Sequence, residues 1–363
     1  GYMLTGFPWG ALGYIWADTP VAQSAAWIGL YGLSVITVFW AACVHWLFLR
    51  KQIFWMVLVL VGVWPVAWIG GDMRLTMQKS ALTERTVRLV QPNAPQHQKW
   101  DPAFARLFFE RSLEFTAAEP SVDLVVWPES ALPVSFENAE TLIEQIALAA
   151  DGTALLLGAL RLENEKVLNS IVYMDQNGVA KVVYDKHHLV PFGEYLPFEH
   201  WLDRIGLGFT SDLFGTGFAA GEGPKRINIA PLGAVVPLIC YEAVFPQDVS
   251  FASQEAAILL LLTNDAWFGG FAGPQQHLAQ AKMRSIEQGL PMIRVANTGI
   301  SAMIDPYGRS LKQLGLNTAG FIDAQVPQPA PATLYRRFEI WTVFAILFAI
   351  LMLSLICRRQ ISG

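Results

Sequence analysis

The sequence predicts a layered α/β domain with a mixed sheet, attached to helices that are long enough to span a membrane. From Leu82 to about Arg337 the composition is that of an ordinary globular domain, and helical patterns alternate with strand patterns. Apolar runs of membrane length stand on both sides of that stretch. The chain of 363 residues is 53% hydrophobic and only 15% charged, whereas soluble domains carry about 25% charged residues. The flanking runs account for this deficit of charge.

The apolar excess resolves into three candidate spans, Val21–Leu49, Ile53–Gly70 and Phe338–Cys357. A spanning helix needs roughly 20 apolar residues, so the first run exceeds the requirement and the second is near its lower limit. Pro65 should kink the second run. The alternative is a set of buried core helices in a soluble protein. It is disfavoured because three runs of this length are hard to bury in one domain.

Positive charges at the ends of these runs predict how they cross the membrane. Arg50 and Lys51 join the first two runs, and Arg358 and Arg359 follow the last one. Positively charged ends stay in the cytoplasm. The globular part should therefore lie on the opposite side, which in a bacterium is the periplasm. The charges just after the second run have mixed signs and do not decide the orientation by themselves. An even number of spans separates Lys51 from Arg358, so both ends can lie in the cytoplasm.

The spans divide the chain into three parts. Residues 1–71 should form the last part of a larger transmembrane helical region, and residues 72–333 an extracytoplasmic domain. Residues 334–363 should form a C-terminal transmembrane helix with a short cytoplasmic tail. The chain begins Gly-Tyr-Met without the charge pattern of a signal peptide, so we expect further membrane helices before Gly1. The net charge of −5 gives no reason to expect a nucleic-acid partner.

Periodicity within the globular part predicts individual elements. Strands are expected over 86–91, 122–126, 153–160, 167–175, 179–184, 235–240, 257–263, 291–296 and 301–305. Helices are expected over 104–117, 140–150 and 275–288. Asn177-Gly178 lies between two of the strands and predicts a hairpin turn.

The segment Trp201–Pro224 fits neither periodicity. It combines six glycines with large apolar side chains, among them Phe209 and Phe214. Long loops of this kind in compact domains are usually functional or disordered. The glycines allow large backbone movements, and the aromatic side chains are costly to leave in water. We interpret the segment as a lid that rests on the bilayer and admits a lipid.

Three short segments carry the groups that acyl transfer through a thioester requires. Glu129, Lys186 and Cys240 each stand at the end of a strand-like apolar run. A carboxylate can act as a base, an ammonium can stabilise an oxyanion, and a thiol can be the nucleophile. Taken singly, each has a plainer interpretation: a surface turn residue, a solvated charge at a strand end, and a buried core cysteine. The combination, in a chain with membrane-length flanks, favours catalysis.

These segments resemble the Glu-Lys-Cys triad of the nitrilase, or carbon–nitrogen hydrolase, superfamily. Residues 264–268 and 284–287 are also similar to that superfamily. The segment 187–197, His-His-Leu-Val-Pro-Phe-Gly-Glu-Tyr-Leu-Pro, resembles the lysine segment of the bacterial apolipoprotein N-acyltransferase family. So do residues 6–9, residues 127–131 and the flanking spans. The resemblance covers essentially the whole chain and implies an αββα sandwich attached to transmembrane helices.

The resemblance also implies roles for individual residues. Cys240 would be the nucleophile, Glu129 the base and Lys186 the oxyanion stabiliser. The supporting residues would be Glu194, Glu242 and Tyr241, whose backbone N–H could be a second oxyanion donor. The substrate-binding residues would be Trp100, Trp267, Phe209 and Phe214. For Trp100, a packing aromatic is an equally good interpretation.

The implied reaction moves an sn-1 acyl chain from a glycerophospholipid, such as phosphatidylethanolamine, to an apolipoprotein. The acceptor is the α-amino group of an N-terminal diacylglyceryl-cysteine. The expected location is the bacterial inner membrane, with several crossings and the catalytic domain in the periplasm. No cofactor is required by this scheme.

No metal site is expected. His187 and His188 are adjacent, and neighbours on a strand point to opposite faces. The six histidines show no ligand spacing such as His-x-x-x-His. Two rival functions stay open. One is a membrane-tethered amidase of the nitrilase type, which the triad would permit. The other is a receptor on an inactive nitrilase scaffold, against which the complete triad weighs.

Overall fold

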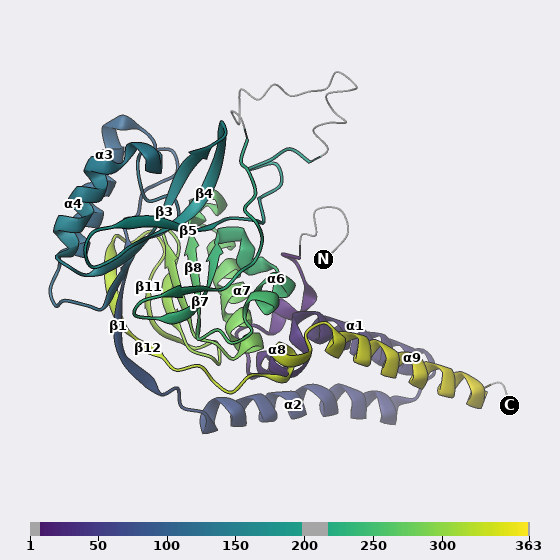
Figure 1. Ribbon diagram of the computed structural model, residues 1–363. Coiled ribbons are helices and arrows are strands. Elements are labelled where there is room, and N and C mark those ends of the chain that lie inside the picture. The colour runs from purple at the N-terminus through teal and green to yellow at the C-terminus, as the bar shows by residue number, and fades with distance from the viewer. Residues whose placement is uncertain (1–7, 198–216, 362–363) are drawn as a thin grey trace, which may run out of the picture.

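The computed structural model describes residues 8–197 and 217–361 of the chain (Figure 1). Two sheets of six strands form the centre of the globular part. The first sheet has the order β12 (Gly320–Pro327), β1 (Leu82–Gln91), β2 (Leu124–Val126), β3 (Ala154–Glu163), β4 (Lys166–Met174) and β5 (Ala180–Asp185). The second has the order β11 (Ser310–Leu314), β10 (Ser301–Ile304), β9 (Met292–Ala296), β8 (Ile258–Thr263), β7 (Gly233–Ile239) and β6 (Ile227–Ile229).

Each sheet contains three neighbouring parallel strands with antiparallel strands at its edges. The parallel strands are β1, β2 and β3 in the first sheet and β7, β8 and β9 in the second. Strand β5 also runs in the direction of β3, because both pair antiparallel with β4. The residues that follow β2, β3 and β5 therefore emerge at one edge of the first sheet.

Helices cover the outer face of each sheet. The helices α3 (Pro102–Thr116) and α4 (Glu140–Ala150) pack on the first sheet, and α6 (Pro246–Ala252) and α7 (Gly273–Gln288) on the second. Short 3₁₀ turns are η3 (Phe136–Asn138), η5 (Cys240–Val244) and η6 (Asp265–Phe268). This arrangement is the αββα sandwich that the sequence resemblance implied.

The apolar core explains why the central strands contain continuous hydrophobic runs. In β8 every residue is buried. Ile258, Leu260 and Leu262 belong to the core between the sheets, whereas Leu259 and Leu261 pack towards the covering helices. A strand covered on both faces needs apolar side chains at every position.

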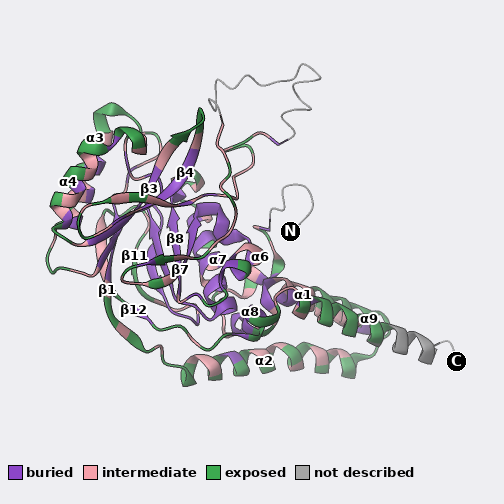
Figure 2. Ribbon diagram, viewed as in Figure 1, coloured by how far each residue is buried: buried purple, intermediate pink, exposed green. Residues whose placement is uncertain are grey.

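Three long helices lie outside the sandwich and extend away from it side by side (Figure 1). They are α1 (Ala25–Leu49), α2 (Ile53–Met77) and α9 (Trp341–Ile361). The short helices η1 (Leu12–Trp16) and η2 (Pro20–Ser24) precede α1, and α8 (Leu334–Phe338) precedes α9. Figure 2 shows mostly exposed and partly buried positions along α2, whereas the first turns of α1, next to the sandwich, are buried.

Two of these helical segments, Pro20–Leu49 and Ile53–Met77, are long and apolar enough to cross a membrane. The apolar part found in α9, Trp341–Met352, is shorter. Exposed apolar surfaces of this extent are unfavourable in water and mark contact with a membrane or with other protein.

Several elements differ from the sequence-based expectation. Helix α2 continues to Met77, beyond the expected end at Gly70, because residues 71–77 keep helical geometry although charges appear. Helix α9 begins at Trp341 instead of Phe338, since the positive φ of Glu339 ends α8. The strands β6, β11 and β12 and the helix α6 were not predicted. The hairpin at Asn177-Gly178 is confirmed: it joins β4 to β5, and Gly178 has a φ of 77°.

A buried carboxylate, that of Glu287, joins the sandwich to the first membrane-length helix. Gly29 breaks α1 with a φ of 66°, so the backbone N–H of Leu30 begins a new helical segment without an intrahelical partner. Glu287 of α7 accepts a hydrogen bond from that N–H at 2.7 Å. The same carboxylate lies 2.9 Å from Nε of Arg284, and both side chains are fully buried.

We expect Glu287→Ala to destabilise this junction by about 3 kcal/mol, because it leaves the Arg284 charge buried and unpaired. Thermal unfolding of the full chain in detergent should show a clear fall of the midpoint. Glu255→Ala serves as the control, since Glu255 is exposed and its ion pair is with the exposed Arg226. Equal midpoints for the two variants would contradict this role of Glu287.

Candidate functional site

The three chemistry-bearing segments of the sequence meet in one cavity. Glu129 follows β2, Lys186 follows β5 directly, and Cys240 follows β7 directly. All three side chains line a cavity of about 690 Å³ in the described part of the chain. Its volume is in the range of ligand-binding pockets, roughly 300–1,000 Å³. The ends of the strands in two facing sheets thus bring together residues that lie far apart in the sequence.

Glu129 is buried and its carboxylate is held by two neutral donors. Asn169 of β4 donates its amide Nδ2 to Oε1 at 2.7 Å. The backbone N–H of Asn264, just after β8, donates to Oε2 at 2.7 Å. Nζ of Lys186 lies 3.8 Å from Oε1. These contacts fix the orientation of the carboxylate in the cavity.

A glycine makes room for the turn that carries Glu129. Ser130 adopts a φ of 49°, which turns the chain sharply after the carboxylate. Gly158 of β3 packs against this turn, and a Cβ at that position would lie 2.6 Å from Cα of Glu129. The position therefore admits no side chain without moving the base.

Lys186 is 1% exposed and lies between two carboxylates. Its Nζ donates to Oε1 of Glu194 at 2.8 Å, and the other oxygen of Glu194 accepts from the backbone N–H of Val190 at 2.8 Å. Burial alone would lower the pKa of Lys186, but the charges of Glu194, Glu129 and Cys240 outweigh it and raise the pKa. Lys186 is therefore an ammonium at neutral pH. The structure places Glu194 as its direct partner, where the resemblance implied a supporting residue.

Cys240 stands at the start of η5 with a φ of 49° and is 5% exposed. This strained turn points the residue out of the strand direction and into the cavity that Glu129 and Lys186 also line. Burial raises the pKa of the thiol, the negative charge of Glu129 adds to the effect, and Lys186 partly opposes it. The thiol is thus protonated at neutral pH, and an attack by sulfur requires a base that removes the proton.

Glu242 holds the turn after Cys240 in place. Its Oε2 accepts from the backbone N–H of Ile239 at 2.7 Å. Its Oε1 accepts from the backbone N–H of His187 at 2.7 Å and from the hydroxyl of Tyr184 at 2.9 Å. One fully buried carboxylate therefore connects the nucleophile turn with the segment that carries Lys186. Tyr241, between Cys240 and Glu242 in the sequence, also lines the cavity.

Two functional groups were missed by the sequence analysis. The first is His277 of α7, whose Nε2 lies 3.1 Å from the carbonyl oxygen of Cys240 and whose Nδ1 lies 2.8 Å from Asp265. Arg294 donates to the other oxygen of Asp265 at 2.6 Å. All three side chains are fully buried. The segment 264–268 was a signal for Asp265, but nothing in the spacing indicated the histidine.

The second missed group is Lys99. Its Nζ donates to the backbone carbonyl oxygen of Glu129 at 3.1 Å, and the side chain lines the cavity. Burial lowers the pKa of Lys99 to about 8, although the charges of Glu129 and Cys240 act in the opposite direction. The site therefore contains a second ammonium group whose charge is lost at a much lower pH than that of Lys186.

The expected substrate-binding residues fall into two groups. Trp100 and Trp267 line the cavity and are well exposed, Trp267 to 68%. Phe209 and Phe214, with most of the expected lid, lie outside the described residues. Phe218, at the end of that segment, lines the cavity and donates its backbone N–H to the carbonyl oxygen of Glu194 at 3.1 Å.

The expectation for the adjacent histidines was wrong in its geometry. His187 and His188 do not lie on a strand, because β5 ends at Asp185. Both rings turn towards Asp248 of α6, at 3.3 Å and 3.0 Å from its Oδ2. The alternation of strand side chains therefore does not apply to them.

Comparison with known proteins identifies the family of the chain. The model of the carbon–nitrogen hydrolase family matches residues 66–333, and that of the apolipoprotein N-acyltransferase N-terminal domain matches residues 1–43. An apolipoprotein N-acyltransferase of Rhodopseudomonas palustris is 37% identical over 387 residues, covering 100% of this chain and 72% of the relative. The chain belongs to the apolipoprotein N-acyltransferase family. A member from Bradyrhizobium diazoefficiens is 36% identical and covers 100% of this chain and 71% of the relative.

Solved structures support the fold. An amidase of the nitrilase superfamily from Nesterenkonia, solved as a mutant, has a TM-score of 0.51 at 19% identity, covering 71% of this chain and 94% of that chain. Its complex with butyramide gives a TM-score of 0.50 at 20% identity, covering 70% and 94%. The nitrilase-like fold, the family and the class of enzyme, an N-acyltransferase, are thus confirmed.

The charge of Lys99 predicts a pH dependence. Lys99 is an ammonium below pH 8 and neutral above it, so its attraction for negative charge in the cavity is lost as the pH rises. We expect the rate of acyl-enzyme formation to fall by roughly tenfold through this range, the equivalent of about 1.4 kcal/mol. Lys99→Met should form the acyl-enzyme slowly at every pH, without the fall in rate near pH 8. Lys99→Arg should move that fall to higher pH. Pre-steady-state rates between pH 6 and 10 measure it.

Lys166→Met is the matched control, because Lys166 is an exposed lysine of β4 outside the cavity. It should keep the full pH profile. A fall in the rate near pH 8 that persists unchanged in Lys99→Met would contradict the assignment of this pH dependence to Lys99.

Proposed function

We propose that the protein transfers an sn-1 acyl chain from a glycerophospholipid to the α-amino group of an N-terminal diacylglyceryl-cysteine. The donor is phosphatidylethanolamine and the acceptor is an apolipoprotein. The observation that carries the proposal is the convergence of three buried residues, Glu129, Lys186 and Cys240, in one cavity. Family membership and apolar helices of membrane length support a lipid as the source of the acyl group.

The first half-reaction acylates the enzyme. Glu129 takes the proton of the Cys240 thiol while the sulfur attacks the ester carbonyl carbon. The ester carbonyl oxygen becomes an oxyanion that the Lys186 ammonium stabilises, together with the backbone N–H of Tyr241. When the tetrahedral intermediate collapses, the bond to the glycerol oxygen breaks. That oxygen takes the proton from Glu129, and lysophospholipid leaves.

The second half-reaction consumes the thioester. The acceptor amine attacks the thioester carbonyl carbon and Glu129 removes one of its protons. Collapse of the second intermediate breaks the carbon–sulfur bond, and the sulfur recovers the proton from Glu129. The product is an amide, and Cys240 is a thiol again. Two substrates thus use one cysteine in turn.

The geometry of Glu129 suits this double use. Asn169 and the Asn264 N–H donate to its carboxylate and hold both oxygens in the same place through each step. The closer ion pair of Lys186 is with Glu194, at 2.8 Å, whereas the base lies 3.8 Å away. Proton transfer at Glu129 therefore leaves the principal partner of the ammonium unchanged.

We further propose that the enzyme is a multi-pass protein of the bacterial inner membrane, with residues 72–333 in the periplasm. The helices Pro20–Leu49 and Ile53–Met77 support membrane insertion. The positive charges of Arg50, Lys51, Arg358 and Arg359 support the orientation. Trp100 and Trp267 are proposed to contact the lipid chain at the cavity, with Phe209 and Phe214 from the lid.

Transfer in proteoliposomes tests the function. The full chain is supplied with phosphatidylethanolamine labelled in either acyl chain and with a diacylglyceryl-cysteine peptide. We expect label only from the sn-1 chain and none with Cys240→Ala. Glu129→Gln should slow transfer by about 10²–10⁴-fold, as loss of a general base does.

Glu110→Gln is the matched control, because Glu110 is an exposed residue of α3. It should transfer at the parental rate. Hydrolysis of short amides without any acyl transfer to the peptide would instead favour the membrane-tethered amidase.

A further inference from the structure

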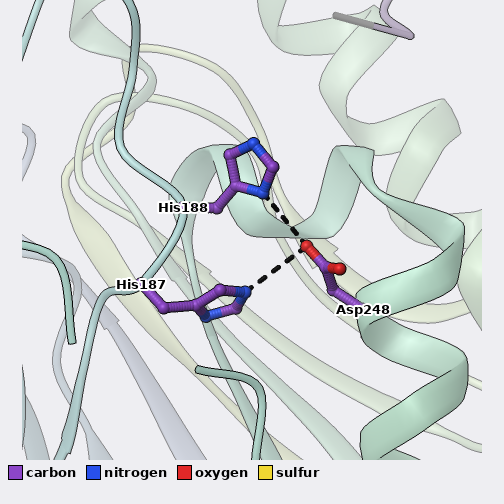
Figure 3. A group of neighbouring side chains, drawn as sticks. All are labelled: His187, His188 and Asp248. Carbon is purple, nitrogen blue, oxygen red and sulfur yellow. Dashed lines mark hydrogen bonds and ion pairs between the residues drawn. The ribbon is translucent and has the colours of Figure 1, made fainter. Parts of the chain in front are cut away.

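A second cluster of chemically active side chains lies outside the catalytic cavity. His187, His188 and Asp248 place three ligand atoms within 4.8 Å of one another. None of the three lines the 690 Å³ cavity. Figure 3 shows that both imidazole rings point towards the same oxygen of the Asp248 carboxylate. Among the described residues, this is the group whose donor set suits a metal ion.

Two of the distances in the cluster correspond to ligand spacings around a tetrahedral ion, and all three ligand atoms lie within 4.8 Å of one another. Nε2 of His187 lies 3.3 Å and Nδ1 of His188 lies 3.0 Å from Oδ2 of Asp248. Zinc bonds to nitrogen and oxygen of 2.0–2.1 Å place neighbouring tetrahedral ligands about 3.3 Å apart. An ion could therefore bind among the three atoms with small side-chain movements.

The surroundings orient the imidazole of His187 as in established metal sites. Its Nδ1 lies 2.7 Å from Oε1 of Glu242 and 2.8 Å from the hydroxyl oxygen of Tyr184. A carboxylate on the far nitrogen holds the proton there and leaves the lone pair of Nε2 for a metal. Metal-binding histidines almost always have such a partner.

The ring of His188 is also fixed. It stacks on Phe245 with ring centroids 3.4 Å apart and meets the edge of Tyr241 at 5.7 Å. Side-chain exposures of 29% for His188 and 19% for Asp248 leave these two ligands in contact with solvent, which can supply water as a fourth ligand.

We propose that His187, His188 and Asp248 form a binding site for a first-row divalent transition metal such as Zn²⁺. Two imidazoles and one carboxylate suit this class, whereas Mg²⁺ and Ca²⁺ prefer oxygen ligands. The site is structural: it connects α6, through Asp248, to the segment that begins with Lys186. The ion touches no reacting atom. It stabilises the position of the catalytic lysine through the polypeptide chain.

Zinc binding to the full chain in detergent tests the proposal. All proteins carry Cys240→Ala, so that the nucleophile cannot bind the metal. After treatment with a chelator, Zn²⁺ affinity is measured by competition with a chromogenic chelator, and Co²⁺ is added separately as a spectroscopic probe. We expect one Zn²⁺ per chain, removed by the chelator, and a tetrahedral Co²⁺ absorption spectrum.

Graded variants assign the ligands. His188→Gln and Asp248→Asn each remove a ligand and should weaken Zn²⁺ binding by more than 100-fold. His187→Asn removes the Nε2 ligand but keeps a donor towards Glu242, and should have the same effect. Tyr184→Phe keeps all three ligands and removes the hydroxyl that contacts Nδ1 of His187 and donates to Glu242, which should weaken Zn²⁺ binding by about 10-fold. His97→Gln, an exposed histidine outside the cluster, should bind as the parent does.

Thermal unfolding gives a second readout. Zn²⁺ should raise the unfolding midpoint of the parent and of His97→Gln but not that of the ligand variants. Absence of Zn²⁺ binding by the parent would overturn the proposal, and so would binding that the three ligand variants leave unchanged. The cluster would then be a hydrogen-bonded pair of imidazoles and a carboxylate.

Discussion

The buried ammonium of Lys186 is the charge around which the site is organised. An unpaired ion at 1% exposure would cost several kcal/mol. Two carboxylates, Glu194 at 2.8 Å and Glu129 at 3.8 Å, compensate it. Each carboxylate is in turn held by a backbone N–H, from Val190 and Asn264. Loops from both sheets are therefore fixed in place by the requirement to neutralise one buried charge.

In the proposed mechanism, this arrangement divides the work of catalysis between two carboxylates. Glu194 compensates the charge of Lys186, and Glu129 accepts and returns protons. The thiol of Cys240 has a raised pKa because it is buried. A protonated thiol needs a base to become a nucleophile, and the proposed mechanism assigns that role to Glu129. Burial of the site thus determines both the need for Glu129 and the strength of the stabilisation that Lys186 offers to an oxyanion.

Helix α7 connects the catalytic site to the membrane-length helices. His277 near its start contacts the carbonyl oxygen of Cys240, and Glu287 near its end contacts the backbone of Leu30 in α1. These residues are ten positions apart, which corresponds to about 15 Å along a helix. One rigid element therefore holds the nucleophile at a fixed distance from the break in α1. The consequence is that the cavity keeps a constant position relative to the apolar helices.

The sequence predicted those parts of the structure whose signals are local. Buried strands such as Ile258–Thr263, the helix Glu140–Ala150 and the turn at Asn177-Gly178 follow from periodicity and turn chemistry. The triad could be predicted because each member follows an apolar run. The short strands β6 and β11 carry too few apolar residues for a periodic signal.

Contacts between distant segments could not be predicted in the same way. Lys99 lies at the site because of a loop conformation, and His277 because α7 packs behind β7. The prediction that His187 and His188 point to opposite faces was wrong, because the alternation of side chains along a strand does not continue beyond the end of β5 at Asp185. In each case the contact that determines the geometry is between residues far apart in the sequence, and no periodic pattern indicates such a contact.

The central claim is that Glu129, Lys186 and Glu194 serve the acylation of Cys240. Mass spectrometry of the intact protein tests it most directly. The full chain is incubated with phosphatidylethanolamine in the absence of an acceptor and analysed before and after hydroxylamine treatment. We predict the added mass of one acyl chain, located on Cys240, labile to hydroxylamine and lost when the diacylglyceryl-cysteine peptide is added. Transfer to the peptide by a protein that never carries such an adduct on Cys240 would contradict the account.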